Sequence, residues 1–443
     1  MTTREEPRAV PTTAASSQLS GDPAPTGWHP GPTSGGALPD AGPAPAPTPF
    51  RELDRRWWLW PVIAFVLTRL FDGALIVLAS RHQIALDGSI HDYKVSIPTP
   101  ASPGYLGVAT NWDAQWFAAV AQHGYPSALP VQDGMVWRNE WAFAPLYPLT
   151  VRGLMAVTGA SFPVVATVVT VLCSLVAVVL VHRLVAETAG RFPARATSLL
   201  LCTSMAAPVL QVAYTEGPAL LFIASALLLL RRRRYALTVL ALLGLGLTRH
   251  VVAPFVVVLV VVAVVERRRL GRWEARSLAT LAAGVAITGL WPLVAAVATG
   301  HLDAFTATQR AWRNHPATTG PLGLFSVGDE LAGATGVLVV AVVLAAILWL
   351  VLRRDGPAWG PELRAWAAAY PTYLFAVAPA AISIFRLMLL AFPLFWVLPN
   401  RVPVPWAHRV TLGVLAATGL YLQWYWIRYF LVIGPISQQF AMP

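Results

Sequence analysis

The run FPVVATVVTVLCSLVAVVLVHR occupies residues 162–183 and carries no Asp, Glu, Lys or Arg before its last position. An α-helix needs about 20 predominantly apolar residues to cross the hydrocarbon core of a bilayer. Comparable apolar runs recur from Trp57 to near the end of the 443-residue chain. The sequence therefore predicts an all-α, polytopic membrane protein.

The overall composition agrees with this fold class. Hydrophobic residues make up 56% of the chain and charged residues 12%, with a mean hydropathy of +0.59. Soluble domains contain about 25% charged residues. Two cysteines, Cys173 and Cys202, lie inside apolar runs and indicate neither a disulfide framework nor a zinc site. Frequent Ala, Arg, Pro and Gly residues suggest a bacterial source.

A net charge of +11 raises the possibility of a nucleic-acid partner. The arginines, however, lie in short segments between apolar runs, such as RRRR at 231–234 and ERRRLGRWEAR at 266–276. This is the positive-inside pattern, in which basic loops stay in the cytoplasm and contact anionic headgroups. We expect membrane lipids and no nucleic acid on this side.

The chain divides into a tail and one membrane domain. Residues 1–50 are rich in Pro, Ala, Thr and Gly, and we expect a disordered cytoplasmic tail. Residues 51–433 form the predicted transmembrane domain, and 434–443 a short outer tail. The first span is expected to be an uncleaved anchor, because no secretory signal precedes it. About eleven spans are expected, near 57–80, 162–183, 196–213, 217–230, 235–249, 251–266, 277–299, 331–352, 364–381, 384–400 and 408–432.

The arginine distribution predicts which loops lie outside the cytoplasm. It places 81–160, the first outer loop, and 300–330, the second, on the non-cytoplasmic face. This alternation requires that WAFAPLYPLTVRGLMAV, at 141–157, does not cross the membrane. Two prolines and Arg152 in this segment favour an interfacial or re-entrant helix.

Three polar motifs fall at the outer ends of predicted spans. They are YTEGP at 214–218, LTRH at 247–250 and SIFR at 383–386. A charge at membrane depth costs about 2.5–3.5 kcal/mol, so such residues usually face a cavity, pair or do chemistry. We expect Glu216, Arg249 and Arg386 to converge on one site. The alternative is snorkelling to the headgroups with simple pairing, such as Glu216 to Arg249.

The stretch NWDAQWFAAVAQHGYP, at 111–126, places a carboxylate on this same face. Apolar or aromatic residues at 112, 116, 117, 120 and 121 form one helical stripe, which predicts a helix lying flat at the surface. Trp112 and Trp116 would sit at headgroup depth. Asp113, at the helix start, is then either a capping residue or a general base in a cleft.

Neighbouring polar residues have simpler explanations. His123 and Tyr125 flank Gly124 and Pro126, which favours a structural turn. His250 could polarise a leaving group or satisfy a neighbour. Gly244 and Gly246 resemble small-residue helix packing. The sequence contains no Walker, dinucleotide-binding or His-x-x-x-His motif, so ATP, nicotinamide and zinc lack support.

These motifs, taken in order, resemble a known family. NWDAQWFAAVAQHGYP, WAFAPLYPLTVR, YTEGPALLF, GLTRHVVAP and SIFRLMLLAFPLF are similar to the PIG-V-like mannosyltransferase family, whose eukaryotic member is GPI mannosyltransferase II. The resemblance runs from about residue 57 to 400. The chain departs from the family pattern at Gly217, where a small polar residue is expected, and at His250–Val251, where Pro is frequent.

The resemblance implies a C-type glycosyltransferase that uses a polyprenyl-phosphate sugar outside the cytoplasm. It implies Asp113 as the catalytic base, a mannosyl donor and a glycolipid or glycan acceptor. Arg386 and Arg249 would stabilise the departing phosphate. The remaining substrate site would comprise Trp112, Gln115, Trp116, His123, Tyr147, Glu216 and His250. A lipid-phosphate donor carries no nucleotide diphosphate, so we expect no obligatory metal or other cofactor.

Other functions remain open at this point. Another hexose or a pentose could replace mannose, and a protein could be the acceptor. A polytopic transporter or lipid flippase with a polar outer vestibule is the main alternative class, although no internal repeat is evident. A non-catalytic scaffold is a third. Multi-pass insertion in the plasma membrane, with the active face non-cytoplasmic, is the expected location.

Overall fold

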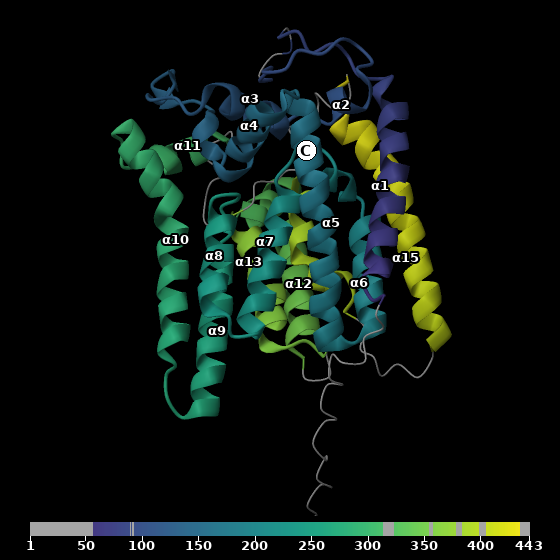
Figure 1. Cartoon of the computed structure of the whole chain (residues 1–443), viewed down its shortest axis with the longest axis vertical. Coiled ribbons are helices and arrows are strands. Elements are labelled where there is room, and N and C mark those ends of the chain that lie inside the picture. The colour runs from purple at the N-terminus through teal and green to yellow at the C-terminus, as the bar shows by residue number, and fades with distance from the viewer. Residues whose placement is uncertain are drawn as a thin grey trace, which may run out of the picture. The chain divides into compact units, whose positions relative to one another are not determined.

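Helices make up nearly all the regular structure in the computed structural model, which describes residues 56–88, 90, 93–312, 323–353, 358–377, 383–397 and 405–434. The predicted tail at 1–50, residues 313–322 of the second outer loop and almost all of the predicted tail at 434–443 lie outside these ranges. Figure 1 shows the arrangement of the helices.

The chain begins with a long helix and a polar segment of short elements. In order these are α1 (Leu59–Ser80), α2 (Gly104–Val108), α3 (Asp113–His123), the hairpin β1 (Val131–Gln132) and β2 (Met135–Val136), the 3-10 turn η2 (Glu140–Ala142) and α4 (Leu146–Thr158). The hairpin pairs Val131 with Val136 and Gln132 with Met135 in antiparallel register.

Mostly apolar helices follow. They are α5 (Phe162–Ala189), α6 (Arg191–Thr203), η3 (Ala207–Leu210), α7 (Glu216–Arg231), α8 (Tyr235–Gly246), α9 (Ala253–Leu270), α10 (Ala275–Thr299), α11 (Ala304–Trp312), α12 (Gly323–Leu352), α13 (Pro361–Val377), α14 (Ser383–Leu387), η4 (Met388–Phe395), α15 (Pro405–Trp426) and the π-helical turn η5 (Ile427–Leu431).

Five of the described helices are long and apolar enough to cross a membrane. They are Leu59–Ser80, Phe162–Ala189, Ala275–Thr299, Ala332–Leu352 and Trp406–Leu431. Several other expected spans are shorter, because polar or Pro/Gly-containing motifs interrupt them. The expected span at 196–213, for example, divides into α6 and η3 at residues 204–206. The chain is therefore an all-α membrane protein, and the number eleven remains a prediction.

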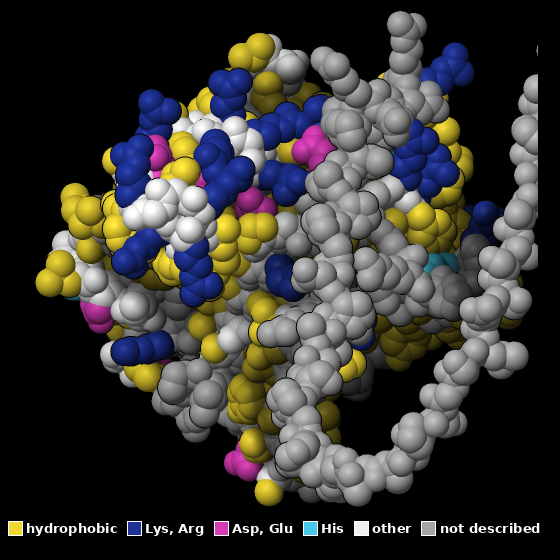
Figure 2. Space-filling view, turned by 90° about the horizontal axis from the view of Figure 1, so that it is seen from below, with side chains coloured by type: hydrophobic (Ala, Val, Ile, Leu, Met, Phe, Trp, Pro, Cys, Tyr) yellow, Lys and Arg dark blue, Asp and Glu magenta, His cyan; other side chains and the backbone are white. Residues whose placement is uncertain are grey.

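The Arg-rich loops gather at one end of these helices. The end of α5 meets the end of α7, where Arg232 Nη2 lies 2.6 Å from Glu187 Oε1. Tyr235, at the start of α8, donates to Glu266 near the end of α9, at 2.5 Å. The indole of Trp60, at the start of α1, donates to the Arg195 carbonyl of α6. Figure 2 shows Lys and Arg side chains gathered on this face.

The short elements of the predicted first outer loop lie at the opposite end (Figure 1). The α4 helix has 13 residues, fewer than a bilayer crossing requires. Its start is tied to the α8–α9 connection by a hydrogen bond from Leu146 N to Leu247 O at 2.7 Å. The α10–α11 region joins the same end, since Trp291 Nε1 donates to Trp141 O at 3.0 Å.

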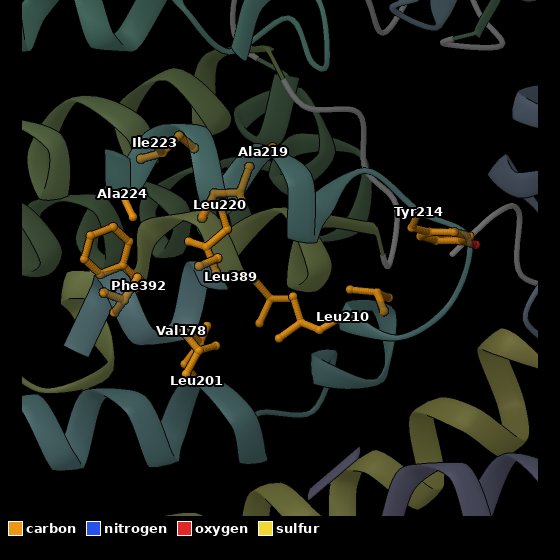
Figure 3. Close-up of a cluster of buried hydrophobic side chains, with 14 of the residues drawn as sticks. Val178, Leu201, Leu210, Tyr214, Ala219, Leu220, Ile223, Ala224, Leu389 and Phe392 are labelled. Carbon is orange, nitrogen blue, oxygen red and sulfur yellow. The ribbon is translucent and has the colours of Figure 1, made fainter. Parts of the chain in front are cut away.

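The core between α5, α6, α7 and η4 brings the start of α7 close to α5. Figure 3 shows this core, with Val178, Leu201, Leu220 and Phe392 packed together. Its small residues let the backbones approach. A methyl group at Gly217 would lie 2.0 Å from Ser174 Oγ and 3.2 Å from the Thr170 carbonyl oxygen. The departure from the family pattern at Gly217 thus coincides with a close contact between α7 and α5.

The other glycines singled out in the sequence also serve packing. A side chain at Gly244 would meet the ring of Phe222 on α7, and one at Gly246 would meet Ile287 on α10. The prediction that both allow helices to approach is confirmed. Both contacts position α8, whose end leads to Arg249.

Candidate active site

Four charged side chains from separate parts of the chain form one network. Arg386 Nη2 lies 2.6 Å from Asp113 Oδ2, and Arg386 Nη1 lies 2.8 Å from Glu216 Oε1. Arg249 Nη1 contacts the same Glu216 oxygen at 3.1 Å. Two carboxylates therefore alternate with two guanidinium groups, and the formal charges cancel.

Access to solvent differs sharply among these groups. The side chain of Glu216 is 0% exposed, that of Asp113 is 19% exposed and that of Arg249 is 17% exposed. Arg386 is almost fully buried, with its guanidinium 5.0 Å from the centre of the Tyr214 ring. Asp113 is thus the carboxylate of the network that a solute can reach.

Helix dipoles support the placement of both acids. Asp113 is the first residue of α3 and Glu216 the first of α7, where the partial positive charge of a helix N-terminus favours a carboxylate. Asp113 makes no capping hydrogen bond, and the cap position belongs to Trp112. The alternative that Asp113 is a helix cap is therefore wrong, because Arg386 engages its carboxylate instead.

The start of α3 is held in an uncommon backbone conformation. Trp112 has φ of 58°, a left-handed value that costs a non-glycine residue about 1–3 kcal/mol. Two contacts over-determine it: Trp112 N donates to the Tyr93 hydroxyl at 2.8 Å, and its indole Nε1 donates to Leu431 O at 3.1 Å. Burial raises the pKa of Tyr93 well above its usual value, so the hydroxyl stays neutral. These contacts fix the direction in which Asp113 leaves the helix.

A second set of contacts positions the start of α7. The Tyr147 hydroxyl of α4 lies 2.9 Å from Thr170 Oγ1 of α5, and Thr170 Oγ1 donates to the Tyr214 carbonyl at 3.0 Å. Tyr147 is buried and does not contact the four-charge network directly. Through Thr170, Tyr147 supports the YTEGP segment that carries Glu216.

The connection between α8 and α9 contributes Arg249 and His250. Arg249 Nη1 donates to Thr215 Oγ1 at 2.9 Å, which orients it toward Glu216. His250 points elsewhere: its ring packs edge-on against Phe305 at 4.8 Å, and its Nε2 has no hydrogen-bond partner. Burial lowers the pKa of His250 to about 4, so the ring is neutral near pH 7.

Two residues of the α3 motif have partners outside the network. Gln115 is buried, and its Oε1 accepts from Ser96 N and Ile97 N at 2.7 Å each. Trp116 stacks on Phe143 at 5.9 Å and has Lys94 Nζ 5.0 Å from its ring centre. Trp116 therefore lies within an aromatic cluster of the protein, and its position at headgroup depth remains a prediction.

The HGYP segment forms the predicted turn. The α3 helix ends at His123, and Gly124 follows with φ of 81°. Tyr125 then stacks on Trp141 at 4.7 Å and donates its hydroxyl to Phe143 O at 2.8 Å. His123 is exposed at the far end of α3, about 15 Å along the helix from Asp113 at 1.5 Å per residue. The structure does not bring His123 to the network.

Sequence reasoning missed a second buried ion pair, inside α1. Arg69 Nη2 lies 2.9 Å from Asp72 Oδ2, and Asp72 is 0% exposed. Arg69 also donates to the carbonyls of Cys202 and Ala207, at the break between α6 and η3. Two opposite charges three residues apart in an apolar run were the available signal. Their contacts indicate that they hold this helix break together.

Metal ligation has no evident place in the described part of the chain, where no group of three or more His, Cys, Asp and Glu side chains lies close enough to hold an ion. The network offers other chemistry. A reachable carboxylate can accept a proton, and two neighbouring guanidinium groups suit phosphate oxygens through charge-assisted hydrogen bonds.

Similarity to known proteins covers the first part of the chain. No curated protein matches the chain. A family model described as Mannosyltransferase (PIG-V) matches residues 56–252, which include Asp113, Glu216 and Arg249. Residues 56–252 are therefore similar to the PIG-V mannosyltransferase family, in agreement with the resemblance of the sequence motifs.

Proposed function

We propose that this membrane mannosyltransferase moves mannose from a polyprenyl-phosphate donor to a hydroxyl group of a glycolipid or glycan. The observation that carries the proposal is the ion pair between Asp113 and Arg386, at 2.6 Å. In this pair a carboxylate that solvent can reach lies beside a buried cation. A general base and a phosphate-binding group would need this placement.

Asp113 is a better candidate for the base than Glu216. A general base must come within hydrogen-bond reach of the acceptor hydroxyl. Glu216 is fully buried and its Oε1 is shared by two arginines, at 2.8 and 3.1 Å. Asp113 is partly exposed and, among the described residues, forms an ion pair with Arg386 alone. We assign Glu216 to holding the two guanidinium groups in place.

The proposed reaction is a single displacement. The acceptor hydroxyl gives its proton to Asp113 while its oxygen attacks the anomeric carbon. The bond from that carbon to the phosphate oxygen breaks, and its electron pair leaves with the lipid phosphate. Attack from the face opposite the leaving group inverts the configuration, so one carboxylate suffices. Arg386 and Arg249 would stabilise the charge that develops on the phosphate.

The active face is proposed to be non-cytoplasmic, in the plasma membrane. The network lies at the end of the helices that carries α3 and α4, opposite the Arg-rich end (Figures 1 and 2). The positive-inside rule assigns the Arg-rich end to the cytoplasm. A donor whose sugar is presented on a lipid phosphate fits the other side, because it requires no soluble nucleotide sugar.

The test is a transfer assay with purified protein in liposomes. Radiolabelled mannose is offered either on a polyprenyl phosphate or on a nucleotide, with membrane lipid extracts as acceptors. We expect transfer from the lipid donor alone, with inversion shown by glycosidase digestion of the product. Parallel glucosyl and arabinosyl polyprenyl phosphates test the choice of sugar. Transfer from the nucleotide alone would refute the proposed donor.

A further inference from the structure

Arg386 has both of its amino groups engaged before any substrate arrives. Nη2 pairs with Asp113 at 2.6 Å and Nη1 pairs with Glu216 at 2.8 Å. The guanidinium lies against the Tyr214 ring, and its Nε is buried without a hydrogen-bond partner. A phosphate that needs a paired amino group of Arg386 must therefore compete with a carboxylate.

The two carboxylates are not equally easy to displace. Glu216 is 0% exposed and also pairs with Arg249 at 3.1 Å. Removing its charge would leave Arg249 without this carboxylate and Arg386 with Asp113 alone, which is costly for an ion network that is largely buried. Asp113 is 19% exposed and sits at the edge of the network. The bond between Arg386 and Asp113 is thus the one that can be exchanged.

The chemistry of the proposed transfer supplies the occasion for this exchange. Asp113 changes from a carboxylate to a neutral acid when it takes the acceptor proton. In the same displacement the phosphate changes from a monoanionic diester to a dianionic monoester. One negative charge disappears beside Arg386 as another appears on the leaving group, so the total charge of the site is unchanged.

We infer that Arg386 is handed from Asp113 to the leaving lipid phosphate as the proton is transferred. Before the step, Arg386 keeps Asp113 ionised and oriented. After it, the neutral acid no longer holds Nη2, and the guanidinium turns to the dianion while Nη1 remains on Glu216. This inference rests on the proposed function, and it assigns Arg386 the coupling of proton uptake to leaving-group departure.

The inference makes a specific claim about Asp113→Asn. Asparagine has the shape of Asp113 without its charge, so the variant should mimic the site after proton transfer. It should lose turnover yet bind a lipid phosphate monoester more tightly than the unmodified enzyme. A charge-assisted hydrogen bond gained by the monoester corresponds to at least about tenfold in the dissociation constant.

The experiment uses two short probes, farnesyl phosphate and its methyl ester. At about pH 8 the first is mainly a dianion, because the second phosphate pKa is about 6, whereas the ester stays a monoanion. Binding to the full-length protein in detergent is measured by calorimetric titration. Asp113→Asn should tighten binding of farnesyl phosphate at least about tenfold and that of the methyl ester clearly less.

A double-variant comparison separates the handover from simple loss of a repelling charge. In an Arg386→Gln background, Asp113→Asn should no longer tighten farnesyl phosphate binding. In an Arg249→Gln background it should still do so, since Arg249 bonds Glu216 and not Asp113. If Arg386→Gln does not fold, Arg386→Lys replaces it, because a single ammonium cannot reproduce the two separate contacts.

The possible results are decisive. Unchanged or weaker binding by Asp113→Asn, or equal tightening with and without Arg386, would overturn the handover while leaving the donor class intact. Failure of the unmodified enzyme to bind farnesyl phosphate at all would overturn the lipid-phosphate donor and the handover with it. Selective tightening that depends on Arg386 would establish the inference.

Discussion

The shortest ion pair of the candidate site joins Arg386 to Asp113, at 2.6 Å between Nη2 and Oδ2. Arg386 belongs to α14 and Asp113 opens α3, so the contact links a late apolar segment to the predicted first outer loop. Both residues depend on long-range contacts. Trp112, directly before Asp113, is held by Tyr93 and by Leu431. Arg386 is held by Glu216.

Replacing Asp113 by Asn should abolish most turnover without unfolding the protein. Loss of a general base typically costs about two to four orders of magnitude in rate. The variant keeps the size of the side chain and leaves Arg386 paired with Glu216. Mannosyl transfer from a polyprenyl phosphate is the measurement, with protein amount checked by blot. Asp303→Asn, at an exposed acid before α11, is the matched control and should remain active.

The nearby aromatic should matter far less. Trp116→Phe keeps a ring against Phe143 and removes no group placed for proton transfer. We expect its rate to stay close to that of the unmodified enzyme. Near-normal transfer by Asp113→Asn, in contrast, would move the search for the base to Glu216.

Arg386→Lys should impair use of the lipid-phosphate donor. Lysine keeps the charge but offers one ammonium in place of a planar fork, so it cannot bridge Asp113 and Glu216 as arginine does. Loss of one preorganised donor to a developing negative charge costs about two to three orders of magnitude. Steady-state kinetics with varied donor concentration should show this fall in kcat/KM.

The matched substitution lies at the opposite end of the helices. Arg272→Lys changes an exposed arginine in the α9–α10 connection and should leave the kinetics unchanged. Equal, small effects of both substitutions would mean that Arg386 only anchors its helix.

The convergence of the four charges could be expected from the sequence for a physical reason. Glu216, Arg249 and Arg386 each sit at the end of an apolar run, where burial without a partner is costly. Arginine distribution then places these ends on one face, and the structure brings all three together with Asp113. The sequence does not predict which pairs form, except for Glu216 with Arg249, the pair expected if these residues only snorkel to the headgroups.

Other site residues depended on packing that no local pattern encodes. The family resemblance implies a place for Gln115 in the substrate site, but its side chain accepts hydrogen bonds from the backbone of residues 96 and 97. His123 and Asp113 belong to the same helix but lie at its opposite ends. Tyr93 lies in a segment without regular structure, and only the fold places its hydroxyl on Trp112 N. Long-range partners of this kind are decided by tertiary contacts.

Glu216→Gln should destabilise the folded protein itself, whether or not substrate is bound. It leaves the guanidinium groups of Arg249 and Arg386 without their shared carboxylate. Removing one member of a buried ion network costs about 3–5 kcal/mol. The midpoint of thermal unfolding in detergent should fall clearly, without any substrate present.

Glu187→Gln provides the comparison for this stability effect. Glu187 also contacts two arginines, Arg183 at 3.1 Å and Arg232 at 2.6 Å, but Arg232 is 40% exposed. Partly exposed pairs contribute about 0–1 kcal/mol, so a small shift is expected. Similar shifts for Glu187→Gln and Glu216→Gln would contradict the role of Glu216 as the anchor of the network.

The orientation of the chain decides which donor the site can meet. Ser127 follows α3 and is exposed at the end that carries the network, whereas exposed Arg272 lies between α9 and α10 at the Arg-rich end (Figure 1). Single cysteines at these positions, in a chain with Cys173 and Cys202 replaced by Ala, can be labelled with a membrane-impermeant maleimide. The Ser127→Cys chain should react in intact cells and the Arg272→Cys chain only after permeabilisation, because basic loops remain in the cytoplasm.

The opposite pattern would place Asp113 in the cytoplasm, where nucleotide sugars are available, and would remove the reason for a lipid-phosphate donor. Labelling of both from one side would mean that α3 and the Arg-rich loops share a face. That result would contradict a bundle that spans the membrane, because Glu216 begins α7 and Arg232, which pairs with Glu187, follows its other end.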